Sequence, residues 1–551
     1  MESKAIHTIR KQRHALAALA VLVFISVFHN ILKDTECNKL FYGSVIDNGH
    51  DITDFDGFAI PENWEESAAA IAASIANDGP KYTISPYNLT DVLLSADIFD
   101  NNYATVVWDP AEDRFIGYYS HRHWWVHGNT KLMFSIKKMT YMLRATFPWR
   151  FQKGINPEFA FGISSGDYPA VTATKCVLER TSLPCKETAP ILHFGSAFRK
   201  PLFPSMIPMP MPEYHHIKCF EQWVKFKNIC PGLKSISNGG ELAFSDEVQK
   251  TWDQLIPQVV WRGTDFGYLG MLGNYLDRPT YEKYIAGKIN PRRVPLKETT
   301  RIMRANYDNL VPRWQGVVLT AEAKIEAGGK RGMLPWANIK FSSYIDKGEK
   351  TPTLGAYEYN QWMDNDFPVA GQGMSQRELG TYRYHIDLGG GGGTTWSGTI
   401  EKLAMPGLLF HHVTPTKDYI HDHMIPWTHY IPVAADLRDL KEKFDWAESH
   451  PMEAQQIANQ GSNLVRRLGT LEGFEELFKE NFEAPLLKMI KAYQPVGQDE
   501  WKSVMVEMDG DLLEPVISCN GLGVYDSDCP RIVGNDPFKE RNQIAPPRPQ
   551  L

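Results

Sequence analysis

Two polar residues at the end of, or a few residues after, apolar, strand-like stretches are the strongest candidates for chemistry in this chain. Asp167 follows residues 159–163, and Arg262 ends the stretch Val259-Val-Trp-Arg262. Open α/β sheets bind ligands beyond the carboxyl ends of their strands, so both side chains are predicted to face a ligand. A carboxylate can accept the proton of an attacking hydroxyl, and a guanidinium can hold a diphosphate through two hydrogen bonds. The alternatives are a turn aspartate before proline and a surface ion pair.

Five consecutive glycines, Gly389–Gly393, form a second candidate ligand site. The alternating residues 382–388 before them predict a strand, and residues 396–405 after them predict a helix capped by Thr394 or Thr395. Glycine lets the backbone approach a ligand closely, and free N–H groups at a helix start suit a phosphate. The run matches neither common glycine motif for nucleotides, so by itself it identifies no ligand. A flexible linker is the alternative interpretation.

Aromatic and histidine-rich stretches supply weaker candidates. His123, Trp124 and Trp125 are predicted to contact the acceptor, that is, the substrate that carries the attacking hydroxyl. Core packing is the alternative. No metal is predicted, because the remaining candidate ligands lie at strand ends or in loops and do not share one helix face. These residues are His411, His412, His421, His423, Asp364 and Asp366. Trp427 and His429 are predicted to pack in the core of their domain instead.

The elements that must position these residues alternate between strands and helices, which predicts an α/β fold. The predicted strands are 103–108, 114–119, 159–163, 191–194, 259–262, 314–318, 339–344, 382–388, 408–410 and 429–433. The predicted helices are 65–76, 131–145, 291–307, 396–405, 436–447, 451–468 and 471–493. Proline-rich residues 201–212 are predicted to be irregular.

The chain has 551 residues, which favours two domains with extensions. A formal net charge of −7 argues against a nucleic-acid binder that relies on bulk charge. The predicted segments are a cytosolic tail (1–13), a signal-anchor helix (14–32), a stem (33–80), a first α/β domain (81–240), a second α/β domain (241–494) and a C-terminal tail (495–551).

The apolar stretch at residues 14–32 is just long enough to span a bilayer and follows a basic segment. This arrangement predicts a single-pass type II protein of the Golgi or endoplasmic reticulum membrane with a lumenal catalytic part. A cleaved signal peptide is the alternative. The sequon Asn88-Leu-Thr90 is consistent with a lumenal position.

Six of the seven cysteines fall into near pairs, and none has the spacing of a zinc or redox site. In an oxidising compartment this spacing predicts three short-loop disulfides, with reduced buried thiols as the alternative. The predicted pairs are Cys176–Cys185, Cys219–Cys230 and Cys519–Cys529, and Cys37 is left over.

Several stretches, taken together and in order, resemble glycosyltransferase family 90, which includes protein O-glucosyltransferases and capsule-type xylosyltransferases. The resemblance extends over residues 155–480, more than half of the chain. The stretches are Asp167-Tyr-Pro169, Trp261-Arg-Gly-Thr264, Tyr382-Arg-Tyr384 with the following glycines, Ile425–Val433 (IPWTHYIPV), Asp436-Leu-Arg-Asp-Leu440 and Ile457-Ala-Asn-Gln-Gly461.

The resemblance implies a GT-B-like fold, with a first Rossmann-like domain for the acceptor, a second for the donor, and a cleft between them. It also implies a UDP-sugar as co-substrate, no metal cofactor, and inversion at the anomeric carbon. Asp167 matches the general base of the family. The residues that match the donor-binding segments are Arg262, Gly263, Thr264, Gly391, Gly392, Gly393, Thr394, Thr395, Trp396 and Ser397. Some members carry an arginine after the glycine loop, and this chain has Thr394–Thr399 there.

The sequence therefore predicts a membrane-anchored lumenal glycosyltransferase. It would move glucose or xylose from a UDP-sugar to a hydroxyl of a protein or glycan. Asp265 and Asp387 are the alternative acids for proton transfer, because both lie beside the donor motifs. A non-catalytic, transferase-like carbohydrate-binding protein and a nucleotide-sugar hydrolase are the other functions left open.

Overall fold

The computed structural model describes residues 60, 84–98, 103–120, 130–165, 189–193, 196–197, 208–210, 212, 216–237, 252–264, 296–305, 307–310, 312–328, 333–343, 368, 371–389, 398–413, 416–417, 419–434, 436–497, 500–507 and 513–532. The predicted anchor at 14–32, the predicted helix at 65–76 and Cys37 lie outside these residues. Within them, no helix combines the length and the apolar character needed to cross a bilayer.

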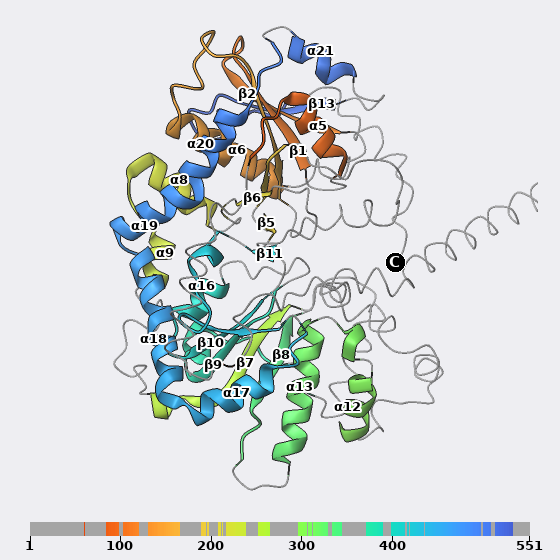
Figure 1. The fold of residues 1–551 in the computed structure, drawn as a ribbon, viewed down its shortest axis with the longest axis vertical. Coiled ribbons are helices and arrows are strands. Elements are labelled where there is room, and N and C mark those ends of the chain that lie inside the picture. Colours follow the sequence, from red (N-terminus) through yellow and green to blue (C-terminus); the bar gives the residue numbers. More distant parts are fainter. Residues whose placement is uncertain are drawn as a thin grey trace, which may run out of the picture. The chain divides into compact units, whose positions relative to one another are not determined.

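The first sheet has six strands in the order β13-β2-β1-β3-β4-β6 (Figure 1). Its strands are β1 (Tyr103–Asp109), β2 (Arg114–Ser120), β3 (Phe159–Ser164), β4 (Ile191–His193), β6 (Pro208–Pro210) and β13 (Leu513–Cys519). β1 pairs antiparallel with β2 and β3, whereas β3, β4 and β6 are parallel. The strands predicted in this part of the chain are confirmed. β6 lies within a stretch predicted to be irregular, and its prolines are tolerated because it is an edge strand.

The core of the first sheet is built on aromatic rings and on the predicted helix α6 (Thr130–Thr146). The ring of Trp108 packs against Phe115 and Phe151, with centroids 4.9 and 5.6 Å away. The smaller helices of this region are α5 (Leu89–Ile98), α8 (Ile217–Phe226) and α9 (Pro231–Ser237). Asn88 and Asp91 cap the start of α5 reciprocally, each side chain accepting the other's backbone N–H, so the predicted sequon begins at a helix cap.

The C-terminal segment 495–551, expected to be a tail, returns to this sheet. It contains α21 (Glu500–Glu507) and β13, and β13 pairs antiparallel with β2 along the outer edge. The predicted disulfide Cys519–Cys529 closes the turn that follows β13, and the predicted disulfide Cys219–Cys230 links α8 to the start of α9. Both predictions are confirmed, while Cys176 and Cys185 lie outside the described residues.

The second sheet has five strands in the order β12-β10-β9-β7-β8. Its strands are β7 (Ile256–Thr264), β8 (Ala337–Ser343), β9 (Tyr382–Asp387), β10 (Leu408–His412) and β12 (Ile431–Val433). β9 lies at the centre and pairs parallel with β7 on one side and β10 on the other, and β10 pairs parallel with β12. A separate antiparallel pair joins β5 (Ser196–Ala197) to β11 (Thr416–Lys417). The chain is thus an α/β protein with parallel pairing in both main sheets.

The strand predicted at residues 314–318 is wrong, because these residues belong to helix α13 (Pro312–Ala327). Residues 312–321 are all buried, including the polar Arg313, Gln315 and Thr320, so the sequence here does not show the separate polar and apolar faces of an amphipathic helix. Periodicity alone cannot distinguish such a run from a buried strand. Pro312 in the first turn and the alanine-rich continuation indicate the helix in retrospect.

The chain divides into two compact units. The smaller unit holds the described residues of Arg262–Pro335 and Ile339–Gly373, which include α12 (Leu296–Ala305), the 3-10 helix η7 (Tyr307–Asn309) and α13. The larger unit holds the described residues of Asp56–Trp261, Trp336–Asn338 and Met374–Leu551. The boundary therefore passes through β7 and β8.

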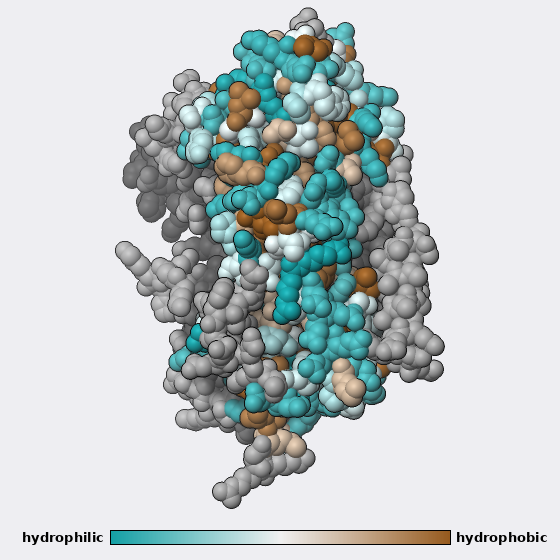
Figure 2. All heavy atoms as spheres, turned by 90° about the vertical axis from the view of Figure 1, so that its left-hand side faces the viewer, coloured by the Kyte–Doolittle hydropathy of each residue, from teal (hydrophilic) through white to brown (hydrophobic). Residues whose placement is uncertain are grey.

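A series of helices follows β12 in the larger unit. They are α17 (Leu440–Ser449), α18 (Pro451–Leu468), α19 (Leu471–Phe478), a π-helical turn η9 (Lys479–Glu483) and α20 (Ala484–Ala492). α17 begins later than predicted, and the predicted helix 471–493 is confirmed as α19, η9 and α20 in direct succession. The face of the molecule that carries α18 and α19 is mainly hydrophilic, with small, separate hydrophobic spots (Figure 2). The helices therefore turn their apolar sides to the core, as amphipathic helices do.

The motif Ile425–Val433 packs in the core, as predicted. Trp427 is fully buried with a positive φ of 60°, and its N–H donates to Tyr430 O at 2.7 Å. Its ring meets Trp446 of α17 edge-on at 5.1 Å. His429 Nδ1 accepts from the N–H of Ile425 at 2.9 Å, and burial lowers the pKa of His429 to about 4.

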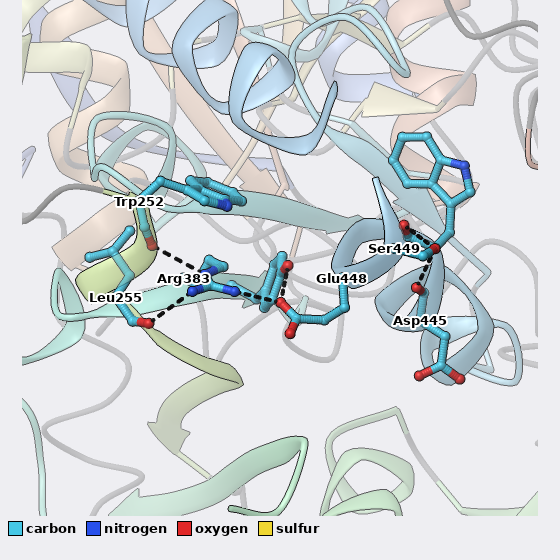
Figure 3. A network of polar contacts seen from close by, with 8 residues as sticks. Trp252, Leu255, Arg383, Asp445, Glu448 and Ser449 are labelled. Carbon is cyan, nitrogen blue, oxygen red and sulfur yellow. Dashed lines mark hydrogen bonds and ion pairs between the residues drawn. The ribbon is translucent and has the colours of Figure 1, made fainter. Parts of the chain in front are cut away.

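A polar network holds the amino-terminal end of β9 against α17 (Figure 3). Glu448 Oε1 accepts from Arg383 Nη1 at 2.8 Å and from the hydroxyl of buried Tyr384 at 2.5 Å. Arg383 Nε also donates to the carbonyl of Trp252 at 3.2 Å. The same region carries α15 (Gln376–Leu379), which has a Ser375–Glu378 capping box, and the 3-10 helix η5 (Trp252–Gln254). This end of β9 is opposite the glycine run, so the network is assigned to stability.

We expect Glu448→Ala to lower the free energy of unfolding by about 1–3 kcal/mol, because it leaves the buried hydroxyl of Tyr384 without its charged acceptor. Denaturant unfolding followed by circular dichroism measures this change. The control is Asp445→Ala on the same helix, where an exposed ion pair to Lys441 should contribute less than about 1 kcal/mol. Equal losses in the two variants would contradict the structural role of Glu448.

Candidate functional site

The carboxyl ends of the parallel strands β7, β9, β10 and β12 meet at one edge of the second sheet. β9 ends at Asp387 and leads directly into the glycine run, and β10 ends at His412. Helix α16 (Gly398–Leu403) follows the run and begins two residues after the predicted start. This is the edge at which α/β sheets bind ligands. Gly389 is described and buried, whereas residues 390–397, with all the predicted contacts at 391–397, lie outside the described residues.

Asp387 is the centre of a buried network at this edge. Its Oδ2 accepts from the hydroxyl of Thr399 at 2.7 Å and from His411 Nδ1 at 2.7 Å. Its Oδ1 accepts from the backbone N–H of His412 at 3.0 Å. The partners come from the first turn of α16 and from the end of β10, so one carboxylate joins three consecutive elements.

The Asp387 carboxylate is ionised at neutral pH. Burial by itself would raise its pKa, but the neighbouring His411, followed by Lys402 and the hydroxyl of Thr399, holds the pKa below its ordinary value. A general base works best with a pKa near the working pH and must reach the substrate. Asp387 is fully buried with both oxygens occupied, so its geometry does not suit the base role considered for it.

The histidines of β10 are held from several sides. The ring of His411 packs edge-on against His421 at 4.8 Å and against Tyr430 at 4.9 Å. His421 belongs to the 3-10 helix η8 (His421–His423). The N–H of Gly389 donates to His412 Nδ1 at 3.4 Å, which ties the first glycine of the run to β10. Within the described residues, no group of three or more histidine, cysteine, aspartate or glutamate side chains could hold a metal ion.

Arg262 lies near the end of β7 in the smaller unit, where backbone groups orient it. Its Nε donates to the carbonyl of Gln372 at 3.2 Å. Gly263 O accepts from Ser342 Oγ at 3.4 Å, and Thr264 O accepts from Arg313 Nη1. The end of β7 is therefore held at three successive residues, through the side chain of Arg262 and through the carbonyl groups of Gly263 and Thr264.

Gly371 makes room for the Arg262 side chain. A Cβ atom at residue 371 would lie 3.0 Å from Arg262 Nε and 3.2 Å from Lys340 Cδ, which is closer than ordinary contact. The N–H of Gly371 also donates to Phe341 O at 2.9 Å, so this backbone cannot move away freely. Gly371 was not predicted from the sequence, because an isolated glycine carries no local signal of which side chain packs beside it.

Asp167 lies outside the described residues, but the strand that leads to it is described. β3 ends at Ser164, whose register partner on β4 is the buried His193. Ser165 follows and is also buried. The buried strand predicted before Asp167 is thus confirmed, and this described stretch ends at Ser165, two residues before Asp167. His123, Trp124, Trp125 and Asp265 also lie outside the described residues.

The Asp387 network was not predicted from the sequence. Asp387 was considered separately as an acid for proton transfer, and the histidines were considered as candidate metal ligands. A signal was available: Asp387 lies near the end of the predicted strand 382–388, and His411-His412 directly follow the predicted strand 408–410. Parallel strands bring their carboxyl ends together. Recognising the two strands as neighbours would have placed these side chains side by side.

Residues 349–472 match the model of a protein family described as Glycosyl transferase family 90. The matched range contains β9, α16, β10, β12, α17 and α18, and therefore the whole Asp387 network. The chain carries a glycosyltransferase family 90 domain. Asp167 and Arg262 lie outside the matched range, so the match itself does not test their roles.

Curated relatives of the chain include protein O-glucosyltransferases. The chain is 34% identical to Protein O-glucosyltransferase 2 of Danio rerio over 91 residues, which cover 15% of this chain and 17% of the relative. It is 28% identical to human Protein O-glucosyltransferase 3 over 93 residues, or 16% of this chain and 17% of the relative. Human Protein O-glucosyltransferase 1 is 34% identical over 59 residues, or 11% of this chain and 15% of the relative. The aligned part thus spans about a sixth of the length of these relatives.

If Arg262 holds a diphosphate, Gly371→Ala should weaken UDP binding by roughly three- to tenfold, because small displacements of a positioned group are costly. Titration calorimetry with UDP measures the change. The matched control is Gly373→Ala, where an added Cβ meets no atom within 4 Å. Arg262→Lys provides the reference for loss of the planar fork and should weaken binding at least as much. Equal UDP affinity in both glycine variants would contradict the hypothesis that Arg262 holds the diphosphate.

Proposed function

We propose that this chain is a glycosyltransferase that transfers a sugar, glucose or xylose, from a UDP-sugar to a hydroxyl group of a protein or glycan. The observation that carries the proposal is the family 90 match over the ligand-binding edge of the second sheet. The names of the relatives, protein O-glucosyltransferases, favour glucose and a protein acceptor. Two sheets with parallel pairing support a GT-B-like arrangement of an acceptor domain and a donor domain.

The proposed reaction is a single displacement with inversion. The acceptor oxygen attacks the anomeric carbon while Asp167 takes the hydroxyl proton. The bond between the anomeric carbon and the diphosphate oxygen breaks, and UDP leaves with the electron pair. The Arg262 guanidinium and backbone N–H groups of the glycine run stabilise the negative charge that grows on the diphosphate. Acceptor contacts are assigned to His123, Trp124 and Trp125.

The positive charges available to a diphosphate support a reaction without a metal cofactor. Arg262 is oriented by the carbonyl of Gln372, and Lys402 lies in α16, the first described helix after the glycine run. Protein cations and N–H groups aimed at a leaving group can replace a metal ion in stabilising its charge. The arginine that some family members carry after the loop is absent here, so the second phosphate contact is assigned to the loop backbone and α16.

We also propose that the catalytic part is lumenal and anchored by residues 14–32 in the Golgi or endoplasmic reticulum membrane. The disulfides Cys219–Cys230 and Cys519–Cys529 support this orientation, because such bonds persist in oxidising compartments. The basic residues that precede the apolar stretch favour a cytosolic N-terminus.

The test is UDP release by the purified full-length chain, with UDP-glucose, UDP-xylose, UDP-galactose and GDP-mannose compared as donors. Thermal shift ranks the donors beforehand, since a ligand at 100 times its Kd stabilises the folded chain by about 2.7 kcal/mol. Transfer that requires an acceptor supports the proposal. UDP release without any acceptor indicates a nucleotide-sugar hydrolase, and carbohydrate binding without UDP release indicates a non-catalytic binding protein.

We expect Asp167→Asn to reduce transfer by about 10²–10⁴-fold while UDP affinity stays near that of the wild type, because asparagine keeps the shape but cannot act as a base. Initial rates at saturating donor and UDP titration measure the two quantities. Asp387→Asn is the comparison: an ordinary base role would give it the same pattern, whereas a buried positioning role would impair donor binding as well. Near wild-type transfer by Asp167→Asn would place the base elsewhere.

A further inference from the structure

We propose that Phe226, Tyr525 and Lys225 form a docking surface for an acidic protein segment. The expected partner is a short stretch of another protein in which carboxylates flank an aromatic side chain. This inference goes beyond the proposed function, because it assigns a binding role to α8 and to the turn after β13, which do not belong to the candidate ligand edge of the second sheet. We refer to the three residues as the aromatic patch.

Two large aromatic side chains are exposed beside the same ammonium group. Phe226, the last residue of α8, is 62% exposed, and Tyr525, in the turn after β13, is 66% exposed. Lys225 Nζ lies 5.1 Å from the ring centroid of Phe226 and 5.9 Å from that of Tyr525. Single exposed apolar side chains are ordinary, but exposed aromatic rings that distant chain segments bring together around a cation are typical of protein-binding sites.

Two constraints hold the backbone that carries Phe226. The disulfide Cys219–Cys230 links α8 to the residue before α9, so Phe226 lies within a short closed loop. Lys227 follows in the left-handed conformation, with a φ of 53°, and its N–H donates to the carbonyl of Trp223 at 2.8 Å. The end of α8 is therefore closed by a covalent bond and by a cap, which fix the point from which the ring projects.

The turn that carries Tyr525 is constrained in the same manner. It lies within the disulfide Cys519–Cys529. The N–H of Tyr525 donates to Asp528 Oδ2 at 3.2 Å, and the carbonyl of Tyr525 accepts from the N–H of Asp528 at 3.0 Å. Asp526 forms an ion pair with Lys137, which ties the turn to α6. A surface that is already ordered loses little conformational freedom on binding, so it suits the recognition of a flexible segment.

Positive charge surrounds the two rings. Lys218, Lys225 and Lys227 are all exposed, and Lys218 and Lys225 lie about 10 Å, or two helical turns, apart on one side of α8. Among the described residues, none of these three lysines forms an ion pair with a carboxylate, whereas the neighbouring Lys138 is paired with Glu221. The face that carries α8 and α19 is mainly hydrophilic with separate hydrophobic spots, as expected for rings bordered by lysines (Figure 2).

The carboxylates that border the patch favour a short partner over a broad anionic one. Asp526 is paired with Lys137, and Glu475 of α19, which lies close enough to interact with the charge of Lys227, is paired with Lys479 at 2.6 Å. An anionic membrane would meet these acids together with the lysines, on a chain with a net charge of −7. A peptide segment can place its carboxylates beside the exposed lysines of α8 alone. Charge complementarity of this kind steers a partner and disfavours the wrong one.

The size of the patch indicates a transient contact. Stable protein interfaces bury roughly 1,200–2,000 Å² in total, which is more than two rings and three lysines can supply. The partner is therefore a segment that docks reversibly and not a permanent subunit. Because its charges are exposed, the contact should weaken as salt is added, since the screening length is about 10 Å at 0.1 M ionic strength.

The test is a titration of the full-length chain with a fluorescent random copolymer of glutamate and tyrosine, which carries both carboxylates and rings. We expect a Kd of roughly micromolar order at low salt. Tyr525→Ser, Phe226→Ser and Lys225→Ala should each weaken binding about fivefold or more, because a few anchor residues carry most of the energy of a contact. Polyglutamate, which lacks rings, should bind more weakly and respond little to the two serine variants.

The matched controls remove an exposed ring and an exposed lysine elsewhere. Trp149 is 51% exposed in the loop after α6, and Lys491 is exposed on α20. Trp149→Ser and Lys491→Ala should stay within about twofold of the wild-type affinity for the copolymer. All five variants replace exposed side chains, so the fold should survive, which circular dichroism checks. UDP binding and sugar transfer should not change in any of them, so this test is independent of the proposed function.

Three results would overturn the docking surface. Equal copolymer affinity in Tyr525→Ser and Trp149→Ser would show that the rings of the patch do not contact the partner, and this comparison decides the point even if Phe226→Ser does not fold. Absence of copolymer binding at every salt concentration would reject an acidic segment altogether. Binding of phosphatidylserine vesicles that Lys225→Ala and Tyr525→Ser both abolish, without copolymer binding, would make the patch a membrane contact instead.

Discussion

The buried, ionised carboxylate of Asp387 is the constraint on which the arrangement of the second sheet depends. A charge in the core must be surrounded by donors, and here they come from the start of α16 and the end of β10. Parallel pairing of β9 with β10 is what brings the two strand ends together. The pairing of β9 with β10 and the start of α16 are thus coupled through one side chain.

The two ends of β9 have different tasks. At its amino-terminal end, Arg383 and Tyr384 share the carboxylate of Glu448, and this contact fastens the strand to α17. At its carboxyl-terminal end, the chain turns into the glycine run at the edge where α/β sheets bind ligands. Strand β9 therefore has stabilising contacts at its amino-terminal end and candidate functional residues at its carboxyl-terminal end. The family 90 match covers both ends.

The first sheet also contains parallel strands whose carboxyl ends lie at one edge of the sheet. β3 and β4 are parallel there, and the paired residues Ser164 and His193 are both buried at their ends. The sheet is completed by β13, which arrives from the far end of the sequence and is followed by the Cys519–Cys529 disulfide. The first sheet therefore needs the C-terminal segment, because without β13 the edge of β2 would be unpaired.

The sequence by itself determined the elements with strong local patterns and the motifs that mark the family. The strands around residues 103–120 and 159–163, the strand before the glycines, and two disulfides were all predicted correctly, because alternation, turn residues and cysteine spacing are local properties. Only the tertiary structure decided that residues 314–318 are helical, because a fully buried run has the same pattern in a helix and in a strand. Likewise, Asp387 and His411 are 24 residues apart and meet only because β9 and β10 are neighbours, which no local pattern encodes.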